Sequence, residues 1–408
     1  MSKTGETKKQ NRWVILAASV VANLCIGSAY AWSVFQKPLI EMFGFSTSQA
    51  SLAYTLSLCI VPFAMILSGK LQALKGARFT LVLGGVLFGA GILSAGFTTG
   101  IVVLYLTYGF LGGIGIGVIY GCTIPNTVKW FPDKRGLAGG IIAGGFGLGS
   151  VLFAPLSAYL IGSTDVLATF RVEGVAYIVV IVAASMLITA PPEGYRPPGW
   201  NPPEKAAGVS SLNYTTGEMV RTARFWILWV MYAIGCIAGL MIIGHASPIG
   251  QEKILITPEV AAGAVALLAI ANTAGRLLWG AVSDRIGRYN ALILMYILSS
   301  VMLLLLNNAG SYLVFVISIM GVGLSFGGFM GVFPSITADN FGALHLGINY
   351  GVMFIAFGLA AFVGPRLAAG IRETSGDYSM AFIIASLMSV AGIVLTLYMR
   401  FSAKKRRA

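Results

Sequence analysis

Apolar runs of about 20 residues recur along the whole chain, and this length is what an α-helix needs to cross a membrane. Hydrophobic residues make up 57% of the 408 residues and charged residues only 10%, whereas about a quarter of a soluble domain is charged. We therefore predict an all-α membrane protein with twelve transmembrane helices. The expected spans are 13–35, 49–69, 79–98, 101–125, 136–161, 174–190, 225–245, 259–282, 290–307, 311–335, 347–370 and 379–400.

A proline-rich polar segment separates the sixth run from the seventh. It reads PPEGYRPPGWNPPEKAAGVSSLNYTTGEMVRTAR, a composition typical of linkers that bury no core. We expect an N-terminal six-helix bundle at 1–190, a cytoplasmic linker at 191–223 and a C-terminal six-helix bundle at 224–408.

The two halves repeat one another at a constant offset. Gly69 and Gly76 of the first half align with Gly280 and Gly287 of the second, and further glycines follow at the same offset. Parallel repeats of six spans predict two bundles related by pseudo-twofold symmetry about the membrane normal. A substrate site is then expected near the midplane, between the bundles.

The basic residues are distributed unevenly between the two sides of the predicted membrane. Of the 27 Lys and Arg residues, 21 lie on the side of both termini and the linker, five lie on the opposite side, and Arg276 lies inside a span. The positive-inside rule therefore predicts a multi-pass protein of the plasma membrane, the cell inner membrane, with both termini cytoplasmic. The net charge of +13 is explained by topology and by contact with membrane lipid, so nucleic acid is not an expected partner.

Arg276 stands inside the apolar stretch LLAIANTAGRLLWGAVSDRIGRYN, at 267–290. An arginine at the centre of a membrane helix costs about 2.5 kcal/mol or more. None of the fourteen acidic residues is expected deep in a span, so we predict that a substrate carboxylate is the partner of Arg276. Asn272 lies four residues earlier on the same helix face. Its amide is expected to donate to the substrate carboxylate or to hold the guanidinium in place. The alternative is that Arg276 snorkels to the cytoplasmic face, toward Asp284.

The stretch GAVSDRIGR resembles the loop signature of the major facilitator superfamily, in which an acid and arginines tie neighbouring helices together at the cytoplasmic face. More narrowly, IGSAYAWSVF, VKWFPDKRGLAGG and ANTAGRLLWGAVSDRIGR resemble the oxalate/formate antiporter and monocarboxylate transporter branch, and the likeness covers nearly the whole chain. The resemblance implies the major facilitator fold and a transporter rather than an enzyme. The structural loop motif comprises Gly280, Asp284, Arg285, Gly287 and Arg288.

The same resemblance implies that Arg276 is the arginine expected in the eighth span of both branches. Oxalate carriers add a lysine in the eleventh span, where this chain has Phe357, and a single cation favours a monovalent anion. The monocarboxylate carriers of animals place an aspartate proton relay four residues before the arginine. This chain has Asn272 there, so proton coupling by that route is not expected.

Further residues are predicted to shape the pocket or to carry protons. The pocket residues, each of which is also compatible with simple helix packing, are Leu24, Gly27, Tyr30, Tyr120, Phe329, Phe333 and Phe357. The proton-coupling candidates are Lys37 at the end of the first span and His245 at the end of the seventh. Lys37 resembles an outer-entrance lysine of the monocarboxylate family, although it fits an interfacial lysine equally. An imidazole changes charge near neutral pH, although a histidine at a helix end is often structural.

We predict a secondary active transporter of small monocarboxylates of lactate or pyruvate size, coupled to protons in symport and working by alternating access. One alternative is an oxalate/formate-type anion exchanger, and another is a membrane carboxylate sensor that does not transport. The sequence has no nucleotide-binding loop, HExxH, GxSxG or Cys/His cluster, so no enzymatic activity, cofactor or metal is expected. The expected partners are the monocarboxylate anion, a co-transported proton and lipid, and the expected oligomeric state is a monomer.

Overall fold

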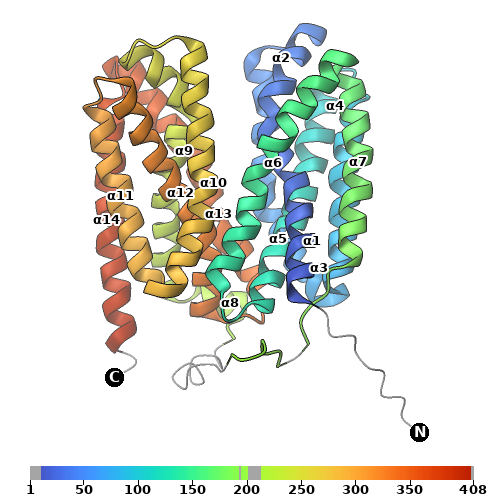
Figure 1. Ribbon diagram of the computed structural model, residues 1–408, viewed down its shortest axis with the longest axis vertical. Helices are drawn as coiled ribbons and strands as arrows, with labels where there is room; N and C mark the ends of the chain where they lie inside the picture. Colours follow the sequence, from blue (N-terminus) through green and yellow to red (C-terminus); the bar gives the residue numbers. More distant parts are fainter. Residues whose placement is uncertain (1–10, 193, 201–212, 406–408) are drawn as a thin grey trace.

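The computed structural model describes residues 11–192, 194–200 and 213–405, and all regular secondary structure within these ranges is helical (Figure 1). Eleven of the described helices are long and apolar enough to cross a membrane. One of them, α3 (Thr47–Ala95), covers the second predicted span and most of the third, so each of the twelve predicted spans has a helical counterpart. The prediction of an all-helical multi-pass membrane protein is confirmed.

The break inside α3 occurs at Gly76, where φ is 81° and ψ is 169°. Gly287 takes a similar conformation, φ 87° and ψ 151°, between α10 (Pro258–Ile286) and α11 (Arg288–Asn307). Glycine tolerates a positive φ because it has no Cβ atom. The two glycines that align in the repeated sequence therefore make the same kind of turn between consecutive spans.

The first and fourth spans each change helix type partway along. The first consists of α1 (Arg12–Gly27), the 3₁₀-helix η1 (Ser28–Ala31) and α2 (Trp32–Phe43). The fourth consists of α4 (Ile101–Leu104), the π-helix η2 (Tyr105–Gly112) and α5 (Gly113–Trp130). Such changes of hydrogen-bonding pattern frequently mark functional sites or hinges within long helices.

The helices form two groups that stand side by side in Figure 1. The N-terminal bundle contains α1 to α7 with η1 and η2, and it ends with α6 (Arg135–Ser163) and α7 (Val166–Met186). The C-terminal bundle contains α9 (Ala223–Lys253), α10, α11, α12 (Tyr312–Phe341), α13 (Leu346–Ser375) and α14 (Ser379–Lys405). Between them lies the short α8 (Thr216–Val220). The bounds 1–190, 191–223 and 224–408 stay a prediction, and residues 193 and 201–212 of the linker lie outside the described residues.

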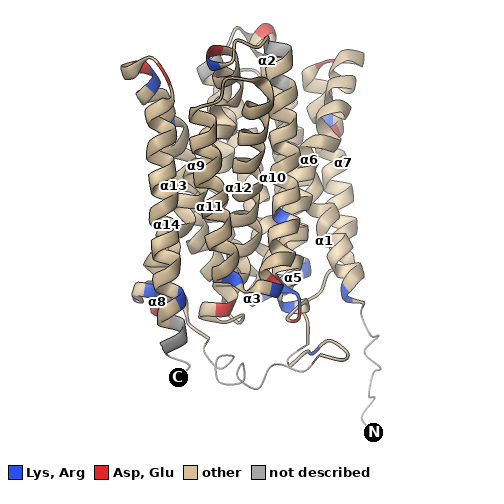
Figure 2. Ribbon diagram, turned by 60° about the vertical axis from the view of Figure 1, so that its left-hand side comes forward, with Lys and Arg blue, Asp and Glu red and all other residues tan. Residues whose placement is uncertain are grey.

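The two bundles meet where α6 packs against α10 and α12, and where α3 packs against α13. We call the end of the molecule that carries α8 and the linker the linker end, and the opposite end the far end. The ribbons of the two bundles approach one another at the linker end and diverge toward the far end (Figure 1). Lys, Arg, Asp and Glu gather at the two ends of the helices, with few between (Figure 2).

The described end of the linker is fastened to the C-terminal bundle. Asn349 of α13 donates to the carbonyl oxygen of Tyr214 at 3.0 Å, and Thr216 donates to the amide oxygen of Asn349 at 2.8 Å. Thr215 and Glu218 form a capping box at the start of α8. Hydrogen bonds from the backbone N–H and the hydroxyl of Thr215 lower the pKa of Glu218, which keeps its carboxylate ionised as this cap requires.

Candidate functional site

Arg276 lies in α10 and is fully buried. Its Nη1 donates a hydrogen bond of 2.5 Å to the carbonyl oxygen of Ala143, in α6 of the other bundle. Its Nε donates to the amide oxygen of Asn272, one turn earlier, at a long distance of 3.5 Å. Its Nη2 is buried and has no hydrogen-bond partner among the described residues. Part of the hydrogen-bonding capacity of the guanidinium is therefore unused among the described residues.

None of the ion pairs in the described part of the chain includes Arg276. A buried charge without an opposite charge is unfavourable by several kcal/mol even after the protein relaxes around it. One neutral carbonyl and one weakly bound amide offset only part of this penalty. The arrangement fits a cation that binds an anionic ligand, as the sequence predicts.

Glycines on two neighbouring helices bring the backbone close to Arg276. A side-chain carbon at Gly140 of α6, or at Gly331 of α12, would collide with the carbonyl oxygen of Arg276. At Gly147 of α6, such a carbon would lie 3.5 Å from the guanidinium carbon Cζ. Small residues permit this close approach of helices, and they bring the guanidinium to the boundary between the two bundles.

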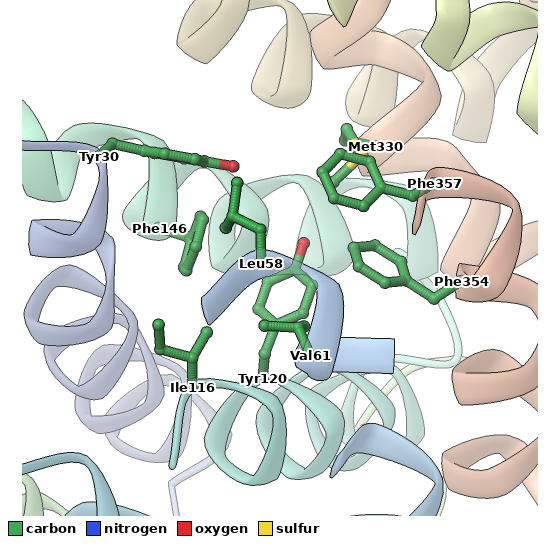
Figure 3. A pocket seen from close by; sticks show the side chains of 9 residues that line it. All are labelled: Tyr30, Leu58, Val61, Ile116, Tyr120, Phe146, Met330, Phe354 and Phe357. Atoms are coloured by element: carbon green, nitrogen blue, oxygen red, sulfur yellow. The ribbon is translucent and has the colours of Figure 1, made fainter. Parts of the chain in front are cut away.

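A pocket lies between the bundles (Figure 3), and Arg276 is not among the residues that line it. Phe146, one of its lining residues, directly precedes Gly147, and Met330, another, directly precedes Gly331. The N-terminal bundle supplies Tyr30, Leu58, Val61, Ile116, Tyr120 and Phe146, and the C-terminal bundle supplies Met330, Phe354 and Phe357. A concave, mostly apolar site with a few polar groups is typical of small-molecule binding.

Two of the residues that line this apolar pocket are tyrosines. The hydroxyl groups of Tyr30 and Tyr120 point toward the middle of the space in Figure 3. The Tyr120 hydroxyl is buried and has no hydrogen-bond partner among the described residues, and Tyr120 is an electrostatic neighbour of Arg276. A phenol and a guanidinium nitrogen, both unpartnered, therefore lie in one region between the bundles.

Tyr30, Tyr120 and Phe357 all line the pocket, and their role in substrate binding stays a prediction. It places Phe329 and Phe333 inside the C-terminal bundle, where their rings lie 4.7 Å from Tyr296 and 4.1 Å from Tyr232, away from the lining residues.

Leu24 and Gly27 lie where α1 crosses α6. A side-chain carbon at Gly27 would collide with the carbonyl oxygen of Phe146. The carbonyl oxygen of Leu24, on α1, lies against Gly149 of α6. The two residues set the spacing of α1 and α6 and do not line the pocket.

Lys37 does not end the first span, because α2 continues to Phe43. Its side chain is 83% exposed and lies 3.8 Å from Glu41, one turn later. An exposed pair of this kind contributes little to stability. The prediction of a role in proton coupling gains no support from this position.

His245 does not end the seventh span either, because α9 continues to Lys253. Its Nε2 lies 2.9 Å from the carbonyl oxygen of Pro365, and its Nδ1 lies 3.4 Å from the hydroxyl of Tyr378. A carbonyl only accepts, so Nε2 carries a hydrogen and Nδ1 accepts from the tyrosine in the neutral imidazole. Both nitrogens are engaged within the C-terminal bundle, which favours the structural interpretation.

The loop motif forms a network across the bundles at the linker end. Asp284 accepts hydrogen bonds from the backbone N–H groups of Gly136 and Leu137, at 2.9 and 2.8 Å, where α6 begins. Arg288 pairs with Asp284 at 2.6 Å and with Asp339 at 3.0 Å.

Arg135 of the N-terminal bundle also reaches Asp339, at 2.7 Å. Gly280 lies against the backbone of Gly136, and Gly287 makes the turn described above. Arg285 is exposed. Together these contacts hold the linker ends of the two bundles against each other.

The expectation that no acidic residue lies deep in a span is wrong for Glu173. The predicted sixth span begins at 174, but α7 begins at Val166, so Glu173 is the eighth residue of the helix and is only 4% exposed. The apolar count misplaced the start of the span because Arg171 and Glu173 interrupt the run. The pocket residue Phe146 and the Ala143 carbonyl were also missed, since no sequence pattern distinguishes them from packing residues.

Comparison with known proteins agrees with this fold. The profile of the Major Facilitator Superfamily matches residues 16–253 and 246–408. The MFS-type transporter YhjX of Escherichia coli, which is described as uncharacterized, is 31% identical over 360 residues, 88% of each chain. The oxalate:formate antiporter of Oxalobacter formigenes is 30% identical over 391 residues, 95% of this chain and 91% of its own.

A more distant relative and a solved structure extend the same likeness. Monocarboxylate transporter 13 of Rattus norvegicus is 24% identical over 404 residues, 95% of this chain and 89% of its own. The crystal structure of the transporter FucP in the outward conformation superposes with a TM-score of 0.71 at 14% identity, over 95% of this chain and 99% of its own. The chain therefore belongs to the Major Facilitator Superfamily of membrane transporters, and it is not an enzyme.

Proposed function

We propose that this protein is a secondary active transporter that carries small monocarboxylates of lactate or pyruvate size together with protons. The observation that carries the proposal is the buried Arg276, whose Nη2 has no partner within the described residues and whose charge has no carboxylate beside it. A substrate carboxylate is the ligand that matches a planar guanidinium fork. Relatives named as an oxalate:formate antiporter and a monocarboxylate transporter support a carboxylate substrate.

The pocket chemistry favours one carboxylate over two. Phe357 stacks on Phe354 at 4.8 Å and supplies no charge where a second carboxylate would need one. The aromatic lining suits the short apolar tail of a monocarboxylate, and the Tyr120 hydroxyl, which has no partner among the described residues, would donate to a carboxylate oxygen.

The Arg276–Ala143 bond suggests how substrate binding is coupled to movement. The bond ties α10 to α6 across the two bundles. A carboxylate that binds both terminal nitrogens of Arg276 would compete with the Ala143 carbonyl. Binding would then replace a direct contact between the bundles by a contact through the substrate, as alternating access at a midplane site requires.

The proposal includes the orientation of the protein in the membrane. The excess of Lys and Arg on the linker side places the linker end and both termini in the cytoplasm of a plasma-membrane protein. The bundles then meet at the cytoplasmic end and diverge toward the outside, so substrate enters from outside in this conformation.

The test uses purified variants in vesicles, with uptake of labelled lactate and lactate-dependent thermal stabilisation as readouts. Arg276→Ala should weaken binding by at least about a hundredfold, about 2.7 kcal/mol, because the carboxylate loses a buried charge-assisted partner. Arg276→Lys keeps the charge but loses the fork and should remain impaired. Asn272→Ala should cost about 1 to 2 kcal/mol, and the double variant should cost less than the sum.

The matched control is Arg366→Ala, which removes an exposed arginine of the same bundle that lies over the Phe362 ring and donates to a carbonyl of its own helix. This variant should bind and transport lactate normally. Normal binding and uptake by Arg276→Ala would disprove the carboxylate site. Uptake that requires a carboxylate on the opposite side of the vesicle would indicate the oxalate/formate-type exchanger instead.

A further inference from the structure

Glu173 is a buried acid that the proposed carboxylate site does not use. It lies in α7, within a candidate membrane span, and is 4% exposed. At 1.5 Å per residue it stands about 10 Å from the start of the helix. Water therefore does not solvate this carboxyl group as it solvates the acids at the helix ends.

Within the described part of the chain, Glu173 accepts hydrogen bonds from two hydroxyl groups. The hydroxyl of Ser157, on α6, donates to Oε1 at 2.5 Å, and the hydroxyl of Tyr177, one turn later on α7, donates to Oε2 at 3.1 Å. No ion pair in the described part of the chain includes Glu173. A carboxylate buried without a cation is strongly unfavourable, so a proton is the ligand that neutralises this group.

The charged and titratable groups around Glu173 offer no substitute for that proton. On α7, Arg171 lies two residues earlier and is engaged elsewhere, with its guanidinium 5.5 Å from the Phe97 ring and 3.4 Å from the Gly96 carbonyl. On η2, the phenol of Tyr108 is an electrostatic neighbour of Glu173. On α1 and η1, the groups beside Tyr177 are the thiol of Cys25 and the hydroxyl of Ser28. On α3, which packs against α7, the neighbouring residues are apolar: Leu93 lies against Gly174 and Phe88 against Tyr177. On α2, Phe35 stacks on Phe170 of α7.

This cluster is connected to the substrate pocket through the break in the first span. Tyr177 bonds Glu173 and has Ser28 as a further hydrogen-bonding neighbour. Ser28 opens η1, which also carries the pocket residue Tyr30. The Tyr30 ring packs on Phe146 of α6 at 4.8 Å, and Ser157 belongs to the same helix. A change in the charge of Glu173 therefore acts on the two elements, η1 and α6, that shape the pocket.

We propose that Glu173 is the residue that binds the proton carried with the substrate, and that Tyr177 and η1 transmit its protonation state to the pocket; this inference rests on the proposed function. The step is a reversible protonation, in which the carboxylate gains a proton when the pocket faces one side and releases the same proton when it faces the other. It assigns the proton to neither His245, whose two nitrogens are both bonded, nor the exposed Lys37.

The test compares Glu173→Gln, which keeps the size and the hydrogen-bonding capacity, with wild type and with Glu173→Asp. Two transport modes are measured in vesicles: exchange of labelled for unlabelled lactate at equal pH, and net uptake driven by an inward acid gradient at clamped membrane potential. We expect Glu173→Gln to retain exchange and to lose the stimulation by the gradient. Glu173→Asp, which remains titratable, should retain part of that stimulation. The matched control is Glu218→Gln, an exposed acid outside the spans, which should behave as wild type in both modes.

A second measurement does not depend on the substrate. Infrared difference spectra of the purified protein between about pH 6, where ordinary exposed carboxyl groups are already ionised, and alkaline pH should show the band of a protonated carboxyl group, which Glu173→Gln abolishes and Glu218→Gln leaves. Persistence of this band in Glu173→Gln, or full gradient-driven uptake by that variant, would show that Glu173 only ties α6 to α7. If the band is lost in Glu173→Gln but wild type takes up no lactate, Glu173 binds a proton and lactate is not the substrate.

Discussion

Phe357 is the residue at which the choice between one and two carboxylates can be tested. It lines the pocket and packs on Phe354, at the position where the family resemblance expects a lysine in oxalate carriers. We predict that Phe357→Lys raises the affinity for oxalate relative to lactate, because a second cation pairs with the second carboxylate.

Thermal stabilisation of the variant, measured with oxalate and lactate in competition, gives the ratio of its affinities for the two anions. Phe357→Met serves as the control, because it keeps an apolar side chain without adding charge, and its ratio should match wild type. An unchanged ratio in a folded Phe357→Lys variant would place selectivity elsewhere in the pocket.

The buried arginine was predictable from the sequence, because a single charge in a long apolar run stands out. Its present partner was not. The bond to Ala143 uses a backbone carbonyl, which every residue has, so no side-chain pattern identifies it. Glu173 was missed for a related reason: hydropathy alone counted it as the edge of a loop, whereas the helix begins seven residues earlier, where Asp165 caps its N-terminus through Ala168.

At the scale of elements, Asp284 joins two helices that belong to different bundles. Its carboxylate accepts from both backbone N–H groups at the start of α6 and pairs with Arg288. We predict that Asp284→Asn lowers the stability of the closed linker end by about 1.5 to 3 kcal/mol, because it removes charge-assisted hydrogen bonds and the favourable interaction with the α6 dipole.

A fall in the thermal unfolding midpoint, measured without substrate, checks this prediction. The control is Asp165→Asn, which alters an acidic cap within a single bundle and should change the midpoint much less, since asparagine also caps well. Equal midpoints for the two variants would mean that the Asp284 contacts do not hold the bundles together.

The existence of the membrane helices followed from composition, but several details of the elements did not. The 3₁₀-helix η1 and the π-helix η2 were not predicted, because apolar composition does not distinguish these geometries from an α-helix. The Gly76 and Gly287 turns were visible as aligned glycines, since only glycine readily adopts the positive φ that both turns use.

The whole molecule should move as two bundles about the pocket. We predict that lactate shifts the distribution of distances between the bundles toward shorter values at the far end, because the substrate bridges Arg276 and the N-terminal bundle. Spin labels on cysteines introduced at Thr164 and Leu255, in a variant lacking the four native cysteines, report this distance. Both positions are exposed at the far end.

A second label pair within the N-terminal bundle, at Thr164 and Phe97, should keep its distance, since both sites belong to one bundle and are exposed. Unchanged distances between the bundles in a variant that still transports lactate would contradict the rocking movement.

The sequence by itself determined that the chain is a helical multi-pass membrane protein, and it singled out one costly cation inside a span. These features depend on local composition, because a membrane excludes charge and requires helices of a set length. Only the tertiary structure decided which side chains meet. Tyr30, Tyr120 and Phe357 come together at the pocket, while Phe329 and Phe333 pack inside the C-terminal bundle. Helical periodicity shows which residues share a face, but the contacts between faces join residues far apart in the chain, and packing alone selects them.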